Sequence, residues 1–277
     1  MTQAPPPSEL LRQNQLRAKK SWGQCFLGDP LILERIAAGC RLSPEDTVVE
    51  LGAGLGHFTR ALAATGANVV AIERDRDLLE ILERDLRLPN VRLVAANAAK
   101  LDFAQVAGVP RPVVAGNLPY QLTSPILFEL IAQQASVCRA VFLLQKEVAE
   151  RLASPPGTRA CGVLSVLLAA FATVELLFEV PARHFTPSPR VDSAVVRIEP
   201  FEPPRFVVHD WSIFTRLVKA AFSQRRKMLR GALKSDLALF QALPIEAALE
   251  RAGVDATARA EQLSIEAFVA LSNALVP

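Results

Sequence analysis

The stretch TVVELGAGLGHF, residues 47–58, decides the fold. A branched apolar run leads into Gly52, Gly54 and Gly56, and apolar residues at helical spacing follow over 55–65. Glycines let a backbone turn tightly and approach a ligand where a Cβ would clash, and the next helix offers free N–H groups at its N-terminus. The spacing differs from the dinucleotide pattern G-x-G-x-x-G, because the third glycine comes one residue early. A glycine-rich turn without a ligand is the alternative interpretation at this point.

The same apolar pattern recurs along the chain. Similar short runs occur at 68–73 (NVVAIE), 91–95 (VRLVA), 112–116 (PVVAG) and 141–145 (VFLLQ), with helix-like segments such as 76–86 between them. Short runs that are apolar on both faces are typical of buried parallel strands. Their alternation with helices predicts a doubly wound α/β sheet with right-handed crossovers. We interpret the segments 173–180 and 192–199 as an antiparallel pair at the sheet edge.

The character of the chain changes after Glu199. PFEPP (200–204) is typical of a linker, and beyond it only helical patterns occur, over about 211–235, 244–252 and 264–275. We therefore expect two domains, residues 1–200 with the sheet and residues 205–277 as a small all-helical domain. Residues 1–18 are expected to be mobile, because this segment begins with a proline-rich run.

Composition excludes several classes of protein. Apolar residues make up 51% of the 277 residues and charged residues 21%, which favours a sizeable core over disorder. The four cysteines contain no CxxC pair and the three histidines are scattered, so we expect no metal site and no disulfide framework. A reducing, cytoplasmic setting fits this cysteine usage. The sequence has no apolar signal core and no run of membrane-spanning length, so we expect no membrane contact.

Polar residues at successive strand ends predict a nucleotide site. Glu73 ends the second strand, twenty-one residues after Gly52, where an acidic side chain can accept hydrogen bonds from ribose hydroxyls. Asn97 follows the third strand and can pair with an adenine edge. Ligands of open α/β sheets bind at this carboxyl edge. The combination favours an adenosine-containing ligand and leaves open whether it donates a hydride, a phosphate or a methyl group.

The fourth strand ends in Asn117, Leu118, Pro119 and Tyr120, which is the only tyrosine of the chain. An adenine N6 amine is a poor nucleophile, and the Asn117 side-chain oxygen and the Leu118 carbonyl can accept its two hydrogens and aim its lone pair. Pro119 stiffens the turn, and Tyr120 can stack on an extruded base. Catalysis by positioning and fixed dipoles then suffices. The alternative is a turn whose tyrosine packs on a neighbouring helix.

Taken together, these motifs resemble class I S-adenosylmethionine-dependent methyltransferases, and more closely the ribosomal RNA adenine dimethyltransferase family. The resemblance runs from about Lys19 to the C-terminus, through KKSWGQCFL (19–27), LLQKEVAERL (143–152), HFTPSPRVDSAVVR (184–197) and FSQRRKML (222–229). It implies a Rossmann-like, mostly parallel sheet of seven strands. It also implies dimethylation of N6 of two adjacent adenines near the 3′ end of small-subunit (16S) ribosomal RNA.

The resemblance assigns roles to individual residues. The contacts to S-adenosylmethionine fall to Gln24, Cys25, Leu27, Gly52, Gly54, Glu73, Asn97 and Asn117. The catalytic turn is Asn117 to Tyr120, and Phe185 meets the other face of the target base. The alternative for Phe185 is ordinary core packing. Two positions depart from the family pattern, since Cys25 stands where the family has Asn and Asn97 where it has Asp. Both changes remove hydrogen-bonding strength, so we expect a weaker affinity for the cofactor.

Positive charge in the last domain predicts RNA binding. Seven Lys and Arg residues occur between Arg216 and Lys234, and 211–235 contains no acidic residue. The candidate phosphate contacts are Arg225, Arg226, Lys227, Arg230 and Lys234. On the helix expected over 211–235, Arg226, Arg230 and Lys234 recur every four residues and share one face. The N-terminal segment adds Arg12, Arg17, Lys19 and Lys20.

The expected partners are small-subunit ribosomal RNA and the assembling small subunit, bound by a monomer. Two alternatives stay open. One is the related enzyme type that methylates large-subunit RNA and confers macrolide resistance, and the other is a ribosome-assembly factor that binds RNA with little catalysis. A nicotinamide-dependent oxidoreductase is disfavoured by the glycine spacing.

Overall fold

The computed structural model describes residues 4–224, 226–234 and 244–276. Its contacts divide the chain into two compact units. The first comprises the chain up to Ala149 together with Glu175–Glu199, and the second comprises Glu150–Val174 and the chain from Pro200 onward. This division differs from the sequence-based boundary at residue 200, because residues 150–174 group with the C-terminal helices.

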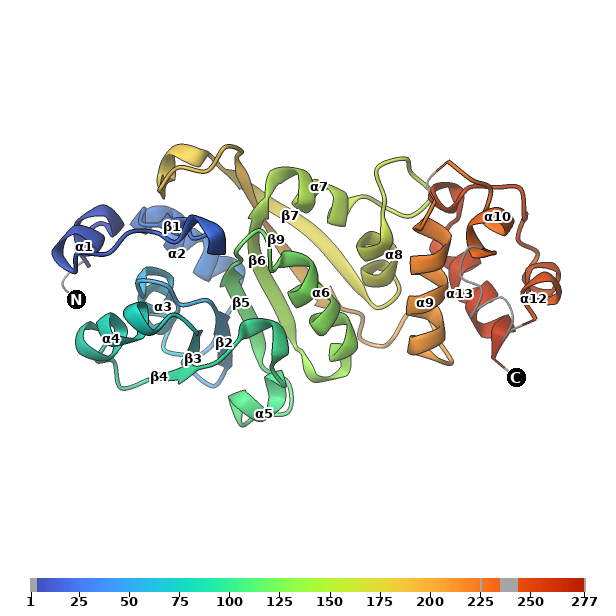
Figure 1. Cartoon of the computed structure of the whole chain (residues 1–277). Helices are drawn as coiled ribbons and strands as arrows, with labels where there is room; N and C mark the ends of the chain where they lie inside the picture. The colour runs from blue at the N-terminus through green and yellow to red at the C-terminus, as the bar shows by residue number, and fades with distance from the viewer. Residues whose placement is uncertain (1–3, 225, 235–243, 277) are drawn as a thin grey trace. The chain divides into compact units, whose positions relative to one another are not determined.

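The first unit is built on a seven-stranded sheet of order β4-β3-β2-β5-β6-β9-β7 (Figure 1). The strands are β2 (Thr47–Leu51), β3 (Asn68–Glu73), β4 (Val91–Ala95), β5 (Val113–Asn117), β6 (Arg139–Gln145), β7 (Ala172–Val180) and β9 (Ser193–Pro200). The pairs among β2 to β6 are parallel, and β9 runs antiparallel to β6. The predicted mostly parallel sheet is confirmed, including the two late strands at its edge.

Helices alternate with these strands. They are α2 (Pro30–Gly39), α3 (His57–Ala63), α4 (Arg76–Asp85), α5 (Phe103–Ala107) and α6 (Thr123–Ala132), with short 3₁₀ turns at Lys20–Trp22, Ala98–Lys100, Gln134–Ser136 and Ala182–His184. Asp29, Asp75 and Asp102 cap α2, α4 and α5 through their carboxylates, which satisfies N–H groups that have no partner within the helix. A small second sheet pairs β1 (Phe26–Leu27) with β8 (Phe185–Thr186).

The N-terminal segment that we expected to be mobile instead contains a helix, α1 (Pro7–Gln13). Leu10 and Leu11 are buried in a cluster with Phe26, Leu55 and Ile81. Two adjacent leucines provide enough apolar surface to anchor one short helix. The prediction of mobility considered the proline-rich start and not these leucines.

The second unit is helical. It contains α8 (Val163–Ala169), α9 (Trp211–Phe222), α10 (Leu229–Leu233), α12 (Ile245–Ala252), a 3₁₀ turn at Ala260–Gln262 and α13 (Ile265–Leu275), while α7 (Lys146–Ala153) crosses the boundary between the units. The predicted continuous helix over 211–235 is wrong, because α9 ends at Phe222. The first N–H groups of α10 bond instead to carbonyls far along the chain, Leu229 to Ala258 (2.7 Å) and Arg230 to Ala256 (3.1 Å).

One carboxyl group lies inside the sheet. Glu50 on β2 is 1% exposed, and its Oε2 atom has no hydrogen-bond partner among the described residues. Burial raises the pKa of Glu50 to about 8; the neighbouring Thr59 hydroxyl lowers it by less, and the charge of Glu73 adds to the rise. The folded chain therefore holds Glu50 in its protonated form over most of the neutral range.

We expect this proton to make stability depend on pH. The unfolded carboxyl releases its proton near pH 4.5 but the folded one near pH 8. The Glu50 contribution is therefore fully present below pH 4.5 and is lost as pH rises to 8, by about 1.4 kcal/mol for each pH unit at most. The variant Glu50→Gln should lack this loss and gain stability relative to the natural chain between pH 5 and 8.5 in denaturant unfolding.

The exposed Glu80→Gln on α4 is the matched control and should leave the pH dependence unchanged. Parallel pH curves for the natural chain and Glu50→Gln would contradict a raised pKa at this position.

Candidate active site

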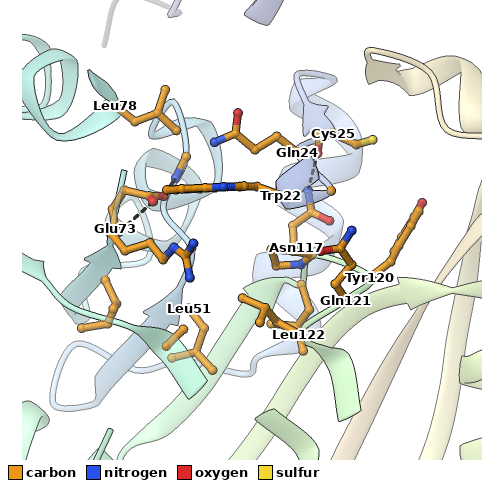
Figure 2. Close-up of a pocket in the computed structure, with 18 of the residues that line it drawn as sticks. Trp22, Gln24, Cys25, Leu51, Glu73, Leu78, Asn117, Tyr120, Gln121 and Leu122 are labelled. Carbon is orange, nitrogen blue, oxygen red and sulfur yellow. Dashed lines mark hydrogen bonds between the residues drawn. The ribbon is translucent and has the colours of Figure 1, made fainter. Parts of the chain in front are cut away.

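A cavity of about 290 Å³ lies at the carboxyl edge of the sheet (Figure 2). Its walls come from the ends of β2, β3 and β5, from the residues after β4, and from the segment before β1. The lining residues are Ser21–Phe26, Leu51, Gly52, Gly54, Ile72–Arg74, Leu78, Ala96, Ala98 and Asn117–Leu122. The strand ends that the sequence singled out therefore meet around one cavity, whose volume is near the lower end of small-molecule sites, roughly 300–1,000 Å³.

The turn after β2 presents main chain rather than side chains to this cavity. Gly52 has φ +81° and Gly54 has φ +59°, backbone conformations that L side chains rarely adopt. The N–H groups of Gly52 and Ala53 both donate to the Ile72 carbonyl (2.9 Å each), which fixes the turn against β3. A Cβ at position 52 would point into open space, so the glycine serves the backbone conformation and leaves room beside it.

Glu73 is held rigidly at the end of β3. Its Oε1 accepts from the N–H groups of Arg74 (2.8 Å) and Asp75 (2.9 Å), and its Oε2 accepts from that of Gly54 (2.9 Å). The side chain is 8% exposed and lines the cavity. An ionised carboxylate offers about four lone-pair sites. Three are occupied by main chain, and Oε2 keeps capacity for one further donor, such as a hydroxyl group.

Asn117 ends β5, and its amide has one possible orientation. Its Nδ2 lies 3.0 Å from the main-chain oxygen of Cys25. Because a carbonyl oxygen can only accept, the atom facing it must be the NH₂ group. The Oδ1 atom is consequently turned away from Cys25 and is available as an acceptor. Asn117 and the following residues up to Leu122 line the cavity.

Tyr120 is partly exposed at the same cavity (Figure 2). Its hydroxyl lies 3.4 Å from Ser193 Oγ on β9. Burial raises the pKa of Tyr120 above its usual value of 10, so the ring remains neutral at physiological pH. A neutral ring held at one end by its hydroxyl presents a flat apolar surface. This position agrees with a stacking platform better than with a core residue.

The segment before β1 is tied to the turn after β3 by Asp75, a residue that the sequence interpretation missed. Asp75 is 2% exposed and accepts from Lys19 Nζ (2.6 Å) and Gln24 Nε2 (2.8 Å). Lys19 Nζ also meets Asp77 (2.7 Å). The hydrogen bonds that Lys19 donates to Asp75 and, to a lesser extent, to Asp77 raise the pKa of Lys19. Lys19 is thus paired within the fold, and its predicted contact with RNA stays a prediction.

Trp22 is a second residue that the sequence interpretation missed. It lines the cavity, and Figure 2 shows its indole edge-on within the group of drawn side chains. The Arg74 guanidinium lies 4.0 Å from the ring centroid and Lys19 Nζ 5.1 Å from it. Cations near an aromatic face are attracted by the ring. The signal available in the sequence was the position of Trp22 within KKSWGQCFL (19–27), two residues before the predicted contact Gln24.

Three predicted residues do not reach the cavity. Leu27 and Phe185 are opposite each other in the β1–β8 pair and belong to the buried core, with Phe185 only 5% exposed. Asn97 caps a 3₁₀ turn, with its Oδ1 accepting from Ala99 N–H (3.1 Å), while its neighbours Ala96 and Ala98 line the cavity. Gln24, Cys25, Gly52, Gly54 and Glu73 do reach it. The expected roles of Phe185, Leu27 and Asn97 stay predictions.

The three basic residues that were predicted to share one helix face do not share one in the second unit. Arg226 lies in the turn between α9 and α10, so it shares no helix face with Arg230 and Lys234. Arg230 pairs with Glu246 of α12 (2.8 Å), an acidic partner outside the segment that the sequence analysis considered. Arg225 lies outside the described residues, and Lys227 is exposed in the turn beside Arg226.

The second unit also contains a hollow that is lined mainly by arginines. It is lined by Arg159, Arg226, Arg259 and Glu261, so three arginines from three separate segments and one glutamate border the same hollow. Arg159 and Arg259 lie far from the basic run and could not be identified from local charge. Among the described residues no group of side chains could hold a metal ion, and no helix there is long and apolar enough to cross a membrane.

Comparisons with known proteins agree on one family. The sequence model of the family described as "Ribosomal RNA adenine dimethylase" matches residues 15–276. The "Ribosomal RNA small subunit methyltransferase A" of Myxococcus xanthus (strain DK1622) is 54% identical over 271 residues, covering 98% of this chain and 95% of the relative. The protein of the same name from Anaeromyxobacter sp. (strain K) is 50% identical over 281 residues, covering 98% of both.

Solved structures show the same fold. A dimethyladenosine transferase from Plasmodium falciparum is similar with a TM-score of 0.74 and 26% identity, covering 89% of this chain and 95% of that one. The 23S rRNA methyltransferase ErmE is similar with a TM-score of 0.66 and 26% identity, covering 91% of this chain and all of that one.

Proposed function

Since the chain belongs to the ribosomal RNA adenine dimethylase family, we propose that it transfers methyl groups from S-adenosylmethionine to N6 of two adjacent adenines. The substrate is the 3′-terminal hairpin of small-subunit ribosomal RNA within the assembling small subunit, which places the reaction in the cytoplasm. The orientation of Asn117 is the observation that carries the proposal. The Cys25 carbonyl fixes its amide so that Oδ1 can accept a hydrogen from the target amine.

The cavity fits the proposed methyl donor. S-adenosylmethionine supplies a methyl group activated by its positive sulfur. The side-chain-free turn at Gly52 and Gly54 leaves space along the backbone, and the remaining Oε2 lone pair of Glu73 suits a ribose hydroxyl. Gln24 and the Cys25 main chain border the other side. The reaction has no step that needs a metal.

Asn117 and the Leu118 carbonyl prepare the acceptor amine. An adenine N6 lone pair is delocalised into the ring, and two acceptors for its hydrogens hold it in a nucleophilic geometry. The Nδ2–Cys25 bond leaves Oδ1 free for this purpose. Leu118 is buried and its N–H donates to the Leu143 carbonyl (3.2 Å), which fixes the turn. Such fixed dipoles act without reorganising during the reaction.

We assign the base platform to Tyr120 and RNA phosphate contacts to the second unit, with Arg225, Lys227 and Lys234 retained from the sequence prediction. The hollow of Arg159, Arg226 and Arg259 concentrates positive charge on one surface. Arg230 is already paired with Glu246, so its contribution should be smaller. We propose that the chain acts as a monomer, with the catalytic domain at 1–200 and the RNA-binding domain at 205–277.

Two alternatives are separable by substrate. The likeness to ErmE is one of fold at 26% identity, whereas the small-subunit relatives reach 50% and more over nearly the whole chain, and this favours the small subunit. An assembly factor with little catalysis would have no need for an oriented Asn117 beside Tyr120 at a cofactor-sized cavity.

Methyl transfer itself is the first test. The purified chain, methyl-labelled S-adenosylmethionine and unmethylated small subunits should yield labelled N6,N6-dimethyladenosine, with large subunits as the control substrate. Tyr120→Ala should lower the rate about tenfold or more, because stacking on an aromatic ring contributes about 1–3 kcal/mol per base. Tyr120→Phe keeps the ring and should retain most activity. Label confined to large-subunit RNA would favour the macrolide-resistance type, and tight particle binding without label would favour the assembly factor.

Asn97→Asp should strengthen binding of S-adenosylmethionine. A charged acceptor makes a hydrogen bond roughly twice as strong as a neutral one, so we expect a severalfold lower Kd in calorimetry. Asn68→Asp adds the same charge at an exposed strand start and serves as the control. An unchanged Kd for Asn97→Asp would mean that position 97 does not limit affinity.

Charge reversal in the arginine hollow should weaken RNA binding. Arg226→Glu and Arg259→Glu should each raise the Kd for small-subunit RNA and flatten the dependence of log Kd on log salt, since each lost phosphate contact reduces that slope by about one. Arg87→Glu, exposed in the first unit, is the control. If affinity and salt slope stay intact in both hollow variants, the cluster has a structural role only.

A further inference from the structure

Residues 19–25 form a strap that is tied at both of its ends to the cavity. Lys19, the first residue of the strap, and Gln24, the last but one, both bond to Asp75, which follows β3. The carbonyl of Cys25, the last residue, accepts from Asn117 at the end of β5. Ser21 to Cys25 line the cavity. The strap therefore spans from the proposed ribose side to the proposed amine side.

Asp75 is the fixed point of this arrangement. Its Oδ1 accepts from Lys19 Nζ (2.6 Å) and from the Asp77 N–H (3.2 Å), while its Oδ2 accepts from Gln24 Nε2 (2.8 Å). At 2% exposure its charge is removed from water, and an unpaired buried carboxylate is strongly unfavourable. Lys19 supplies the opposite charge, and this ion pair holds the strap against the turn after β3.

The strap also has an internal bond that limits how it can bend. The Lys19 N–H donates to Gln24 Oε1 (2.8 Å), so the Gln24 amide is held at both of its polar atoms. Its nitrogen faces Asp75 and its oxygen faces the main chain of Lys19. Gln24 directly precedes Cys25, and a shift of Gln24 would displace the Cys25 carbonyl that orients Asn117.

We propose that Lys19 and Asp75 are positioning residues for the reaction. They hold the strap so that Gln24 borders the methyl donor and the Cys25 carbonyl turns the Asn117 amide oxygen toward the target amine. Neither residue touches the reacting atoms, and both act through Gln24 and Cys25. This role rests on the proposed function. It means that one strap positions both the residue beside the methyl donor and the amide that binds the target amine.

Trp22 makes the position of the strap observable. Its indole lies at the cavity with Arg74 and Lys19 near the ring. The chain has two tryptophans, Trp22 and Trp211. In a Trp211→Phe background, emission from Trp22 alone reports whether the strap is in place, and it does so without turnover.

The test compares Lys19→Met, Asp75→Asn and the conservative Lys19→Arg, all as full-length chains in the Trp211→Phe background. Three quantities are measured: the Kd of S-adenosylhomocysteine by calorimetry, the Trp22 emission, and the single-turnover methylation rate at saturating S-adenosylmethionine. Arg87→Met removes an exposed cation outside the strap and is the matched control. Thermal unfolding of every variant separates loss of fold from loss of position.

We expect Lys19→Met and Asp75→Asn to raise the Kd about tenfold, the change expected when a charged hydrogen bond is lost. Both should also shift the Trp22 emission and lower the single-turnover rate severalfold even at saturation, because Asn117 loses its orientation. Lys19→Arg should restore most of each property, and Arg87→Met should change none.

Folded Lys19→Met and Asp75→Asn variants with unchanged Kd and unchanged saturated rate would overturn the positioning role while leaving the proposed function intact. A raised Kd with an unchanged saturated rate would overturn the part of the role that acts on Asn117. If the parent chain itself does not bind S-adenosylhomocysteine, the proposed function fails and the positioning role fails with it.

Discussion

The site depends on three hydrogen bonds from the main chain to one carboxylate. Glu73 receives the N–H groups of Gly54, Arg74 and Asp75, and thereby joins the turn after β2 to the turn after β3. The Gly54 bond needs the left-handed backbone of the glycine turn, and the Asp75 bond sets the start of α4. The same side chain thus fixes the shape of the cavity and keeps one lone pair for its contents. Two strand ends that are separate in the sequence become one rigid wall.

Periodic features of the sequence were sufficient to predict this wall. Short apolar runs identified the parallel strands, and the rule that ligands bind at their carboxyl ends brought Gly52, Glu73 and Asn117 together before any contact was known. The order of the last two strands was not encoded in the same way. β9 lies between β6 and β7, and Arg197 on β9 pairs with Glu175 of β7 and with Glu199, contacts that require the sheet to be assembled first.

The errors share a physical origin, because each involves a partner remote in the chain. Lys19 was interpreted as a surface charge, but the buried Asp75 lies 56 residues away. The basic run was extended as one helix, but the start of α10 bonds to carbonyls at Ala256 and Ala258. Phe185 lies in the core because it pairs with Leu27, a contact that local pattern does not indicate, and its role toward the base stays a prediction. Local sequence pattern indicates whether a residue tends to be exposed or buried. A contact with a residue remote in the chain determines its actual position.

The bond between Asn117 and position 25 uses the peptide oxygen, not the side chain. Every amino acid has that oxygen, so a substitution at position 25 does not by itself remove the hydrogen bond to Asn117. A cysteine at position 25 therefore supplies the same main-chain acceptor to Asn117 as any other residue there would. What this contact requires is the path of the backbone, which the bonds of Lys19 and Gln24 to Asp75 hold in place.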